Sequence, residues 1–210
     1  MIPEREVSMP NFDAGTLTAA FADKYGELPE QNRAGLAQLI DFINADDEIQ
    51  DLRWAAYMLA TVQHECAGAW QPITERGSQQ YFEKYDAGTA LGERLGNTEA
   101  GDGFLFRGRG YVQITGRTNY TNMGNHLGLG TGLSDNPDLA LDPQTAYQIM
   151  SYGMRHGSFT GKKLSDYIHD DVCDYMNARR IINGLDQWEK IQGYAQALEA
   201  MLQGSVAASV

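Results

Sequence analysis

Apolar side chains recur along most of the chain at the spacing of amphipathic helices. Between residues 36 and 43 they stand at positions i, i+3, i+4 and i+7, which places them on one face of a helix. Gly26 stands where a helix can end, and Pro29 suits a first helical turn. Asp186 and Glu189 have the spacing of a capping box. The pattern predicts helices at about residues 17–25, 29–43, 52–66, 171–182 and 186–202, with one more beginning at about 143.

Residues 84–110 interrupt this pattern. Seven glycines stand in the segment, and no helical period survives them. Beyond it, Tyr111, Gln113 and Thr115 alternate with apolar residues, so an extended segment would aim all three to one face. Because loops of this length are usually functional, we expect a functional loop with a small β-hairpin. The whole is a mainly α fold, one domain over residues 1–210 with two lobes.

Composition and length narrow the class of protein. The 210 residues make about one domain, and 42% hydrophobic with 21% charged residues is ordinary globular composition, which excludes wholesale disorder. The longest uncharged apolar run, residues 54–62, is too short for a membrane span. The N-terminus lacks the basic and apolar regions of a secretory signal, so we expect the chain to be made in the cytosol without a signal peptide.

The charge distribution argues against nucleic-acid partners. The net charge is −12, from 28 acids and 16 bases, whereas binding to phosphates is driven by cationic surfaces. Residues 104–120 are an exception, since they hold Arg107, Arg109 and Arg117 without an acid. We expect Arg107 and Arg109 to tie the loop to carboxylates and carbonyls rather than to contact a substrate.

Metal and cofactor motifs are not complete in this sequence. His64-Glu65 lacks the second histidine of a zinc-protease helix, because position 68 is glycine. Cys66 and Cys173 make neither a disulfide framework nor a zinc pattern, and we expect two free thiols. We therefore assign no metal and no cofactor.

Two glutamates remain as candidate chemistry. Glu65 ends an otherwise apolar helix, and Glu75 follows ten residues later, beyond Gly68 and Pro72, so the chain can turn and present it across a cleft. A pair of carboxyl groups, one protonated and one ionised, is what glycosidic hydrolysis requires. By spacing alone, the interpretation of both as ordinary surface glutamates is favoured.

Residues 104–120, Phe-Leu-Phe-Arg-Gly-Arg-Gly-Tyr-Val-Gln-Ile-Thr-Gly-Arg-Thr-Asn-Tyr, resemble the signature of family 19 glycoside hydrolases, the chitinase-like group that includes many phage endolysins. Further segments resemble the same family: residues 57–65, 71–75, 95–103, 135–143 and 181–184. The resemblance covers about residues 35–203.

The resemblance implies an acid, a base and a residue that orients water. Glu65 matches the general acid of the family, Glu75 the base that activates water, and Thr115 a hydroxyl that orients this water. Two positions depart from the family. Cys66 replaces the usual threonine after the acid, and Lys190 falls near a common arginine.

The resemblance also implies a set of sugar-binding residues. Gln113, Asn119 and Asn183 match positions where side-chain amides bind the sugar, and amides suit N-acetyl and hydroxyl groups because they both donate and accept. Tyr111 joins this set, since an extended segment places it on the same face as Gln113 and Thr115.

These observations predict a lysozyme-like, two-lobed helical domain with a glycine-rich central loop, a small β-hairpin and no separate terminal wall-binding module. The expected function is an endolysin-type glycoside hydrolase that cuts β-1,4 bonds of peptidoglycan by inversion, made in the bacterial host cytoplasm and acting on the wall after release. One alternative is a chitinase with the same machinery. Another is a non-catalytic glycan-binding protein, against which the presence of both glutamates counts. We expect a monomer with a peptidoglycan or chitin-like substrate and without nucleic-acid or membrane partners.

Overall fold

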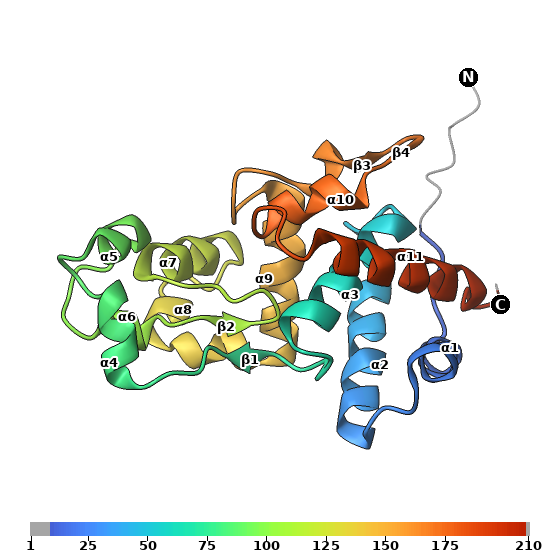
Figure 1. Ribbon diagram of the computed structural model, residues 1–210, viewed down its shortest axis with the longest axis horizontal. Coiled ribbons are helices and arrows are strands. Elements are labelled where there is room, and N and C mark those ends of the chain that lie inside the picture. The colour runs from blue at the N-terminus through green and yellow to red at the C-terminus, as the bar shows by residue number, and fades with distance from the viewer. Residues whose placement is uncertain (1–8, 209–210) are drawn as a thin grey trace. The chain divides into compact units, whose positions relative to one another are not determined.

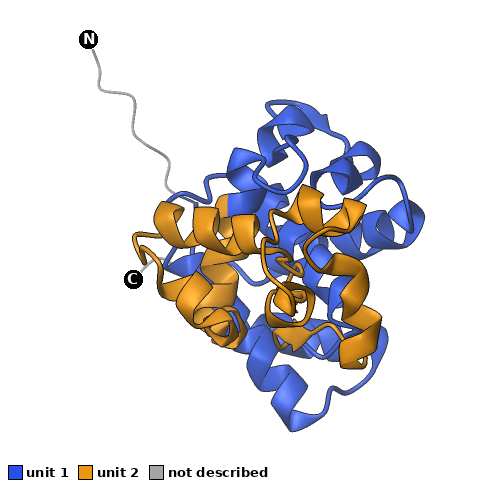
Figure 2. Cartoon of the chain, turned by 90° about the vertical axis from the view of Figure 1, so that its left-hand side faces the viewer, with its two compact units in different colours: residues 1–70, 153–210 blue, residues 71–152 orange. Residues whose placement is uncertain are grey.

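The computed structural model describes residues 9–208 (Figure 1). It is mainly helical and divides into two compact units. Among the described residues, unit 1 comprises 9–70 with 153–208, and unit 2 comprises 71–152 (Figure 2). The prediction of a mainly α chain with two lobes is confirmed. Unit 1 is therefore built from both ends of the chain, and unit 2 from the middle.

Unit 1 is built around one central helix. Its elements are α1 (Ala14–Tyr25), α2 (Glu30–Asn44), α3 (Leu52–Glu65), η3 (Leu164–Asp166), β3 (Ile168–His169), β4 (Val172–Cys173), α10 (Tyr175–Ala178), η4 (Arg179–Ile181) and α11 (Trp188–Gly204). Residues 55–63 of α3 are all buried, and α3 packs along α11 (Figure 1). A helix that is buried on every side is a core element, so α3 gives the residue at its end a fixed position.

The predicted ends of the first three helices are close to the observed ones. Asp13 caps α1 by accepting from the N–H of Thr16 over 2.7 Å, and Gly26 ends it with a φ of 91°. Asp51 caps α3 by accepting from the N–H of Arg53 over 2.9 Å. Beyond α11, Val206 pairs with Phe12 in an isolated antiparallel bridge. Residues 209–210 lie outside the described residues.

The predicted helix at 171–182 is correct only at residues 175–181, where the short α10 and η4 lie. Its first residues instead belong to β4, which pairs with β3 in an antiparallel hairpin. Side chains from α3 hold the hairpin. The guanidinium of Arg53 donates to the carbonyls of Asp170 and Val172, and the indole of Trp54 donates to that of Ile168. These long-range bonds outweigh the local helical pattern. The predicted capping box is wrong as well, since α11 begins after Gln187, which makes no side-chain cap.

Unit 2 holds the glycine-rich segment. Its elements are β1 (Ile73–Thr74), α4 (Gln79–Phe82), η1 (Glu83–Tyr85), α5 (Ala90–Leu95), α6 (Asp102–Leu105), β2 (Arg109–Gly110), α7 (Arg117–His126), α8 (Gly132–Asp135) and η2 (Pro137–Leu141). Helix α9 (Pro143–His156) begins in unit 2 and ends in unit 1. The predicted loop at 84–110 therefore contains η1 and two short helices. Thr89 caps the first of these helices, α5, with its side chain.

The predicted hairpin is present, but Tyr111, Gln113 and Thr115 do not alternate along an extended strand as predicted. β1 pairs antiparallel with β2, and Arg109 also bridges to Ile114. Residues 111–113 form the turn between these two positions, and Gln113 has a φ of 56°. Tyr111, Gln113 and Thr115 therefore do not share the face of an extended strand, and that prediction is wrong.

Both cysteines are free thiols as predicted, Cys66 buried and Cys173 exposed. Among residues 9–208, no helix is both long and apolar enough to cross a membrane. In the same range, no three His, Cys, Asp or Glu side chains come together in a way that could hold a metal ion.

Candidate active site

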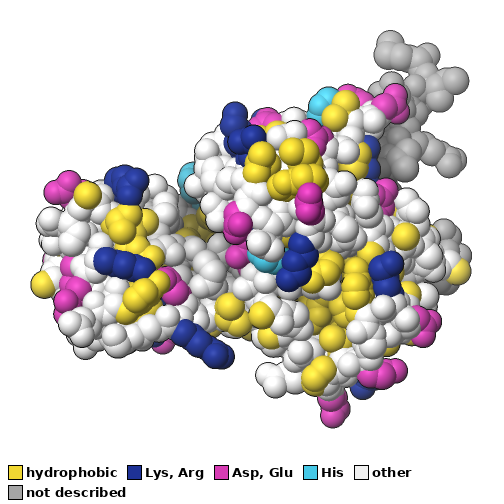
Figure 3. All heavy atoms as spheres, viewed as in Figure 1, with side chains coloured by type: hydrophobic (Ala, Val, Ile, Leu, Met, Phe, Trp, Pro, Cys, Tyr) yellow, Lys and Arg dark blue, Asp and Glu magenta, His cyan; other side chains and the backbone are white. Residues whose placement is uncertain are grey.

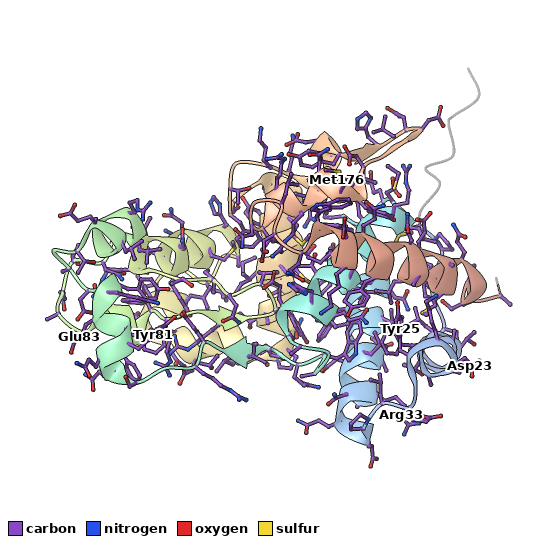
Figure 4. All side chains as sticks on the ribbon, viewed as in Figure 1. Asp23, Tyr25, Arg33, Tyr81, Glu83 and Met176 are labelled. Atoms are coloured by element: carbon purple, nitrogen blue, oxygen red, sulfur yellow. The ribbon has the colours of Figure 1, made fainter. Side chains whose placement is uncertain are left out.

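The carboxyl group of Glu75 lies just after β1 in unit 2. The backbone N–H of Glu75 donates to the carbonyl of Gly108 over 2.7 Å, which extends the β1–β2 pairing by one residue. The N–H of Gly108 donates to Oε2 over 3.3 Å, and the phenols of Tyr81 and Tyr85 donate to Oε1 over 3.4 and 3.5 Å. Figure 4 labels Tyr81 on α4. Among residues 9–208 the carboxyl group of Glu75 accepts from these neutral donors and forms no ion pair, which suits a group that must accept a proton.

Gly108 allows this close approach of backbone and carboxyl group. A Cβ atom at position 108 would lie 2.8 Å from Oε1 of Gln113 and 3.2 Å from Oε2 of Glu75. Any larger residue would therefore push the two side chains away from the backbone. The glycine is needed for this proximity.

Gln113 joins the two sides of the hairpin. Its Nε2 donates to the carbonyls of Ile73 and Gly110, each over 3.0 Å. Both amide hydrogens are thus used within unit 2, and only Oε1 is left to accept from a ligand. The sugar-binding role that the sequence predicts for Gln113 is limited to this oxygen.

The side chains of Thr115 and Asn119 donate to backbone carbonyls of the same segment. The hydroxyl of Thr115 donates to the carbonyl of Gln113 over 3.1 Å, and Nδ2 of Asn119 donates to the carbonyl of Thr115 over 2.7 Å. Thr115 is half-buried and Asn119 exposed. Since its own hydrogen is used, the Thr115 hydroxyl offers its lone pairs to a water. Tyr111 is fully buried. That is a core position rather than the predicted substrate contact.

In unit 1, Glu65 is the last residue of α3 and forms an ion pair with Arg179 of η4. Nη1 of Arg179 donates to Oε1 of Glu65 over 2.6 Å. The side chain of Arg179 is only 3% exposed and that of Glu65 is 21% exposed. Nε of Arg179 donates to the carbonyl of Asp186 over 3.0 Å, which fixes the guanidinium. A charge-assisted bond of this length stabilises the carboxylate that remains after a proton has left.

Arg179 was not among the site residues predicted from the sequence, although its guanidinium is bonded to Glu65. The sequence does carry a signal, because Arg179 interrupts the apolar positions around Ala178 and Ile181. Lys190 lies over the ring of Tyr194, with Nζ 5.7 Å from the ring centroid. Asn183 is exposed, and its backbone N–H donates to the carbonyl of Arg179 over 3.0 Å.

Helix α3 also carries buried polar atoms that have no hydrogen-bond partner among the described residues. They are the hydroxyl of Tyr57, Oε1 of Gln63 and Nδ1 of His64. Burial lowers the pKa of His64 and raises that of Tyr57, so both stay neutral near pH 7. Burial also raises the pKa of Cys66 to about 12, which keeps this thiol protonated and unreactive.

Two arginines of the signature, Arg109 and Arg117, form ion pairs within unit 2, as predicted for Arg109, whereas Arg107 makes a local bond to a carbonyl. Nε of Arg109, which is buried, donates to Asp138 over 2.8 Å, and its Nη1 donates to two backbone carbonyls and to the hydroxyl of Tyr120. Arg107 donates to the carbonyl of Phe104 over 2.7 Å. Arg117 forms two bonds to Asp102, of 2.8 and 2.6 Å. Although burial opposes ionisation, Arg117 and two backbone N–H groups lower the pKa of Asp102.

Comparison with known proteins shows the fold. Chitinase C from Streptomyces griseus HUT6037 matches with a TM-score of 0.59 at 19% identity, over 93% of this chain and 80% of that one. A glutamate-to-glutamine mutant of chitinase C gives 0.59 at 20% identity over the same shares. A bacterial family 19 chitinase gives 0.55 at 19% identity, over 89% of this chain and 94% of its own. No family model and no curated protein matched the sequence. The chain therefore has the lysozyme-like helical fold of family 19 chitinases.

Proposed function

We propose that the protein is a glycoside hydrolase that cleaves β-1,4 bonds of bacterial peptidoglycan by an inverting acid/base mechanism. The observation that carries this proposal is the different environment of the two glutamates. Glu65 is paired with a buried guanidinium, whereas Glu75 accepts only from neutral donors among the described residues. Two carboxyl groups in unlike environments are the usual sign of an acid and a base with separate roles.

In the proposed reaction, Glu65 donates its proton to the glycosidic oxygen as the bond from that oxygen to C1 breaks. Oε1 of Glu65 is bonded to Arg179, so Oε2 is the oxygen that carries the proton. Arg179 then stabilises the carboxylate left behind. Glu75 removes a proton from a water whose oxygen bonds to C1 on the opposite face of the sugar, and the hydroxyl of Thr115 orients this water. One product keeps the proton from Glu65 on its new hydroxyl, and the other keeps the hydroxyl of the water on C1. Glu75 then releases to solvent the proton it took from the water, and Glu65 takes up a proton from solvent, which restores both groups.

Chitin is the second candidate substrate, because the similar solved structures are of chitinases. Chitin and peptidoglycan share β-1,4-linked GlcNAc units, and peptidoglycan adds a lactyl-peptide on alternate sugars. Residues 104–120 resemble the signature of the whole chitinase-like group, which includes many phage endolysins, so they fit either substrate. Cationic side chains beside Glu75 support peptidoglycan.

The test is incubation with purified peptidoglycan and, separately, with chitin, followed by mass analysis and early NMR of the new reducing ends. We expect muropeptides cut between amino sugars, with peptide stems intact and the α-anomer formed first. A β-anomer or anhydro-sugar ends would contradict the inverting mechanism. Products from chitin alone would make the protein a chitinase, and glycan binding without any product would make it a non-catalytic binding protein.

A further inference from the structure

Cationic and aromatic side chains alternate on the surface of unit 2 next to Glu75. Nζ of Lys84 lies 3.5 Å from the ring centroid of Tyr81 and 4.6 Å from that of Tyr85. Cζ of Arg107 lies 4.2 Å from the ring centroid of Phe104. We call these five residues the Tyr81 surface. On the left of Figure 3, dark-blue and yellow side chains alternate over unit 2.

Two aromatic rings of the Tyr81 surface, those of Tyr81 and Phe104, are exposed and pack on a buried ring. Tyr81 is 45% and Phe104 37% exposed, which is unusual for large apolar side chains and is typical of binding sites. Phe82, which is fully buried, supports both rings from below. Its centroid lies 5.0 Å from that of Tyr81 and 5.8 Å from that of Phe104, in edge-to-face packing. Rings fixed in this way can stack on sugars at little entropic cost.

The two cations of the Tyr81 surface are available to a ligand. Arg109 and Arg117 form ion pairs with Asp138 and Asp102, but Lys84 and Arg107 take part in none of the ion pairs among residues 9–208. Hydrogen bonding to Tyr81 raises the pKa of Lys84, so its charge persists above neutral pH. Acids outnumber bases 28 to 16 in the chain, so most bases could find an acidic partner. Two cations that form no ion pair and lie on neighbouring rings therefore indicate a binding site.

The Tyr81 surface begins at the proposed base. The phenols of Tyr81 and Tyr85 both donate to Oε1 of Glu75. The Tyr81 surface is therefore in direct contact with the carboxyl group of Glu75. Phe104 also lines a pocket of about 330 Å³ with the acids Glu83 and Asp86. The local field is therefore mixed, and an anion would be recognised by direct contact rather than by long-range attraction.

We propose that the Tyr81 surface binds the carboxylate-bearing sugars of the glycan strand, with Lys84 and Arg107 contacting the carboxylates of the lactyl-peptide groups and the rings of Tyr81 and Phe104 stacking on the sugars. This inference rests on the proposed function and assigns its substrate preference to specific residues. Neutral chitin carries no carboxylate, so the two cations add affinity for peptidoglycan only.

The test compares variants of Arg107, because its guanidinium contacts Phe104 rather than the tyrosines that hold Glu75. Arg107→Gln removes the charge, Arg107→Lys keeps it, and Arg94→Gln removes a charge from the exposed end of α5 as a matched control. The kcat/KM of each is measured on peptidoglycan fragments and on neutral GlcNAc oligomers of equal length, with a thermal melt to check folding.

We expect Arg107→Gln to lower kcat/KM on peptidoglycan about 10-fold, the size of one lost charged hydrogen bond. On neutral oligomers, Arg107→Gln should match the wild type, Arg107→Lys should retain most activity on both substrates, and Arg94→Gln should change neither. Equal losses on both substrates, or no loss on peptidoglycan, would overturn the inference. If the wild type hydrolyses neither glycan, the proposed function fails, and co-sedimentation with cell-wall sacculi then decides the inference. Weaker sedimentation of Arg107→Gln than of Arg94→Gln supports it, and equal sedimentation overturns it.

Discussion

Replacing Glu65 by glutamine tests the proposed acid and its ion pair in one variant. Glutamine keeps the volume and an oxygen that accepts from Arg179, but it has no proton to donate to the leaving group. Loss of general acid catalysis costs about 10²-fold or more in rate. The same substitution removes the negative charge next to a guanidinium that is 3% exposed. The variant should therefore lose stability as well as activity.

The loss of stability can be estimated from the contacts. A hydrogen bond to a charged group contributes about 1.5–3 kcal/mol and a neutral one about 0.5–1.5, so the exchange costs about 1–2 kcal/mol. Arg179 keeps its bond to the carbonyl of Asp186, and Glu65 is 21% exposed, which places the cost toward the lower end. For a chain of this size the melting temperature should fall by about 2–8 °C.

Two assays separate these effects. Lysis of permeabilised cells measures turnover, and thermal unfolding measures stability. The double variant Glu65→Gln with Arg179→Met removes both charges, and it should recover part of the stability without recovering activity. Near wild-type lysis by Glu65→Gln would refute the acid role. An unchanged melting temperature would refute the contribution of the ion pair.

Three further variants test unit 2. Glu75→Gln should reduce turnover about 10²-fold or more, and Thr115→Val should reduce it less, because a hydroxyl orients water but takes no proton. Equal losses of turnover in the two variants, with a lowered melting temperature in Thr115→Val, would indicate a folding defect instead. Gly108→Ala should destabilise the folded protein by about 1–3 kcal/mol through overpacking. The control Gly193→Ala lies in α11 with no atom within 4 Å of its added Cβ, and it should not destabilise the protein. Equal melting temperatures of the two variants would contradict the close approach at Gly108. Asp102 has a lowered pKa in the folded state, so its stabilisation is complete above the ordinary pKa of about 3.9 and is lost as the pH falls through the folded value. Asp102→Asn should therefore lower the melting temperature at pH 7 and change it progressively less in acid, and a difference that grows in acid would refute the assignment.

The sequence predicted elements whose pattern is local. Helix α3 was found because its apolar residues and its start at Leu52 are visible along the chain, and Glu65 was found because it ends that helix. The hairpin at 168–173 was missed because Arg53 and Trp54, far away in the sequence, hold it. Long-range bonds of this kind leave no periodicity to read.

The site was predictable by residue type more than by geometry. The sequence pointed to Gln113, but its φ of 56° is rare for a residue other than glycine, and no alternating pattern indicates it. The same turn buries Tyr111, against the prediction. Arg179 was missed because its partner Glu65 stands in a distant segment, and only the folded chain shows the pair.

The construction of unit 1 from both ends of the chain has a consequence for synthesis on the ribosome. Helix α3 packs along α11, but about 120 residues separate the two, which corresponds to roughly 10 s of translation. During this interval unit 2 is completed from contiguous chain and can fold, while residues 55–63 of α3 still lack the α11 side of their core. A nascent chain stalled before residue 188 would thus expose part of the buried surface of α3. Such a chain should bind chaperones at α3, and release of α11 from the ribosomal tunnel should end that binding.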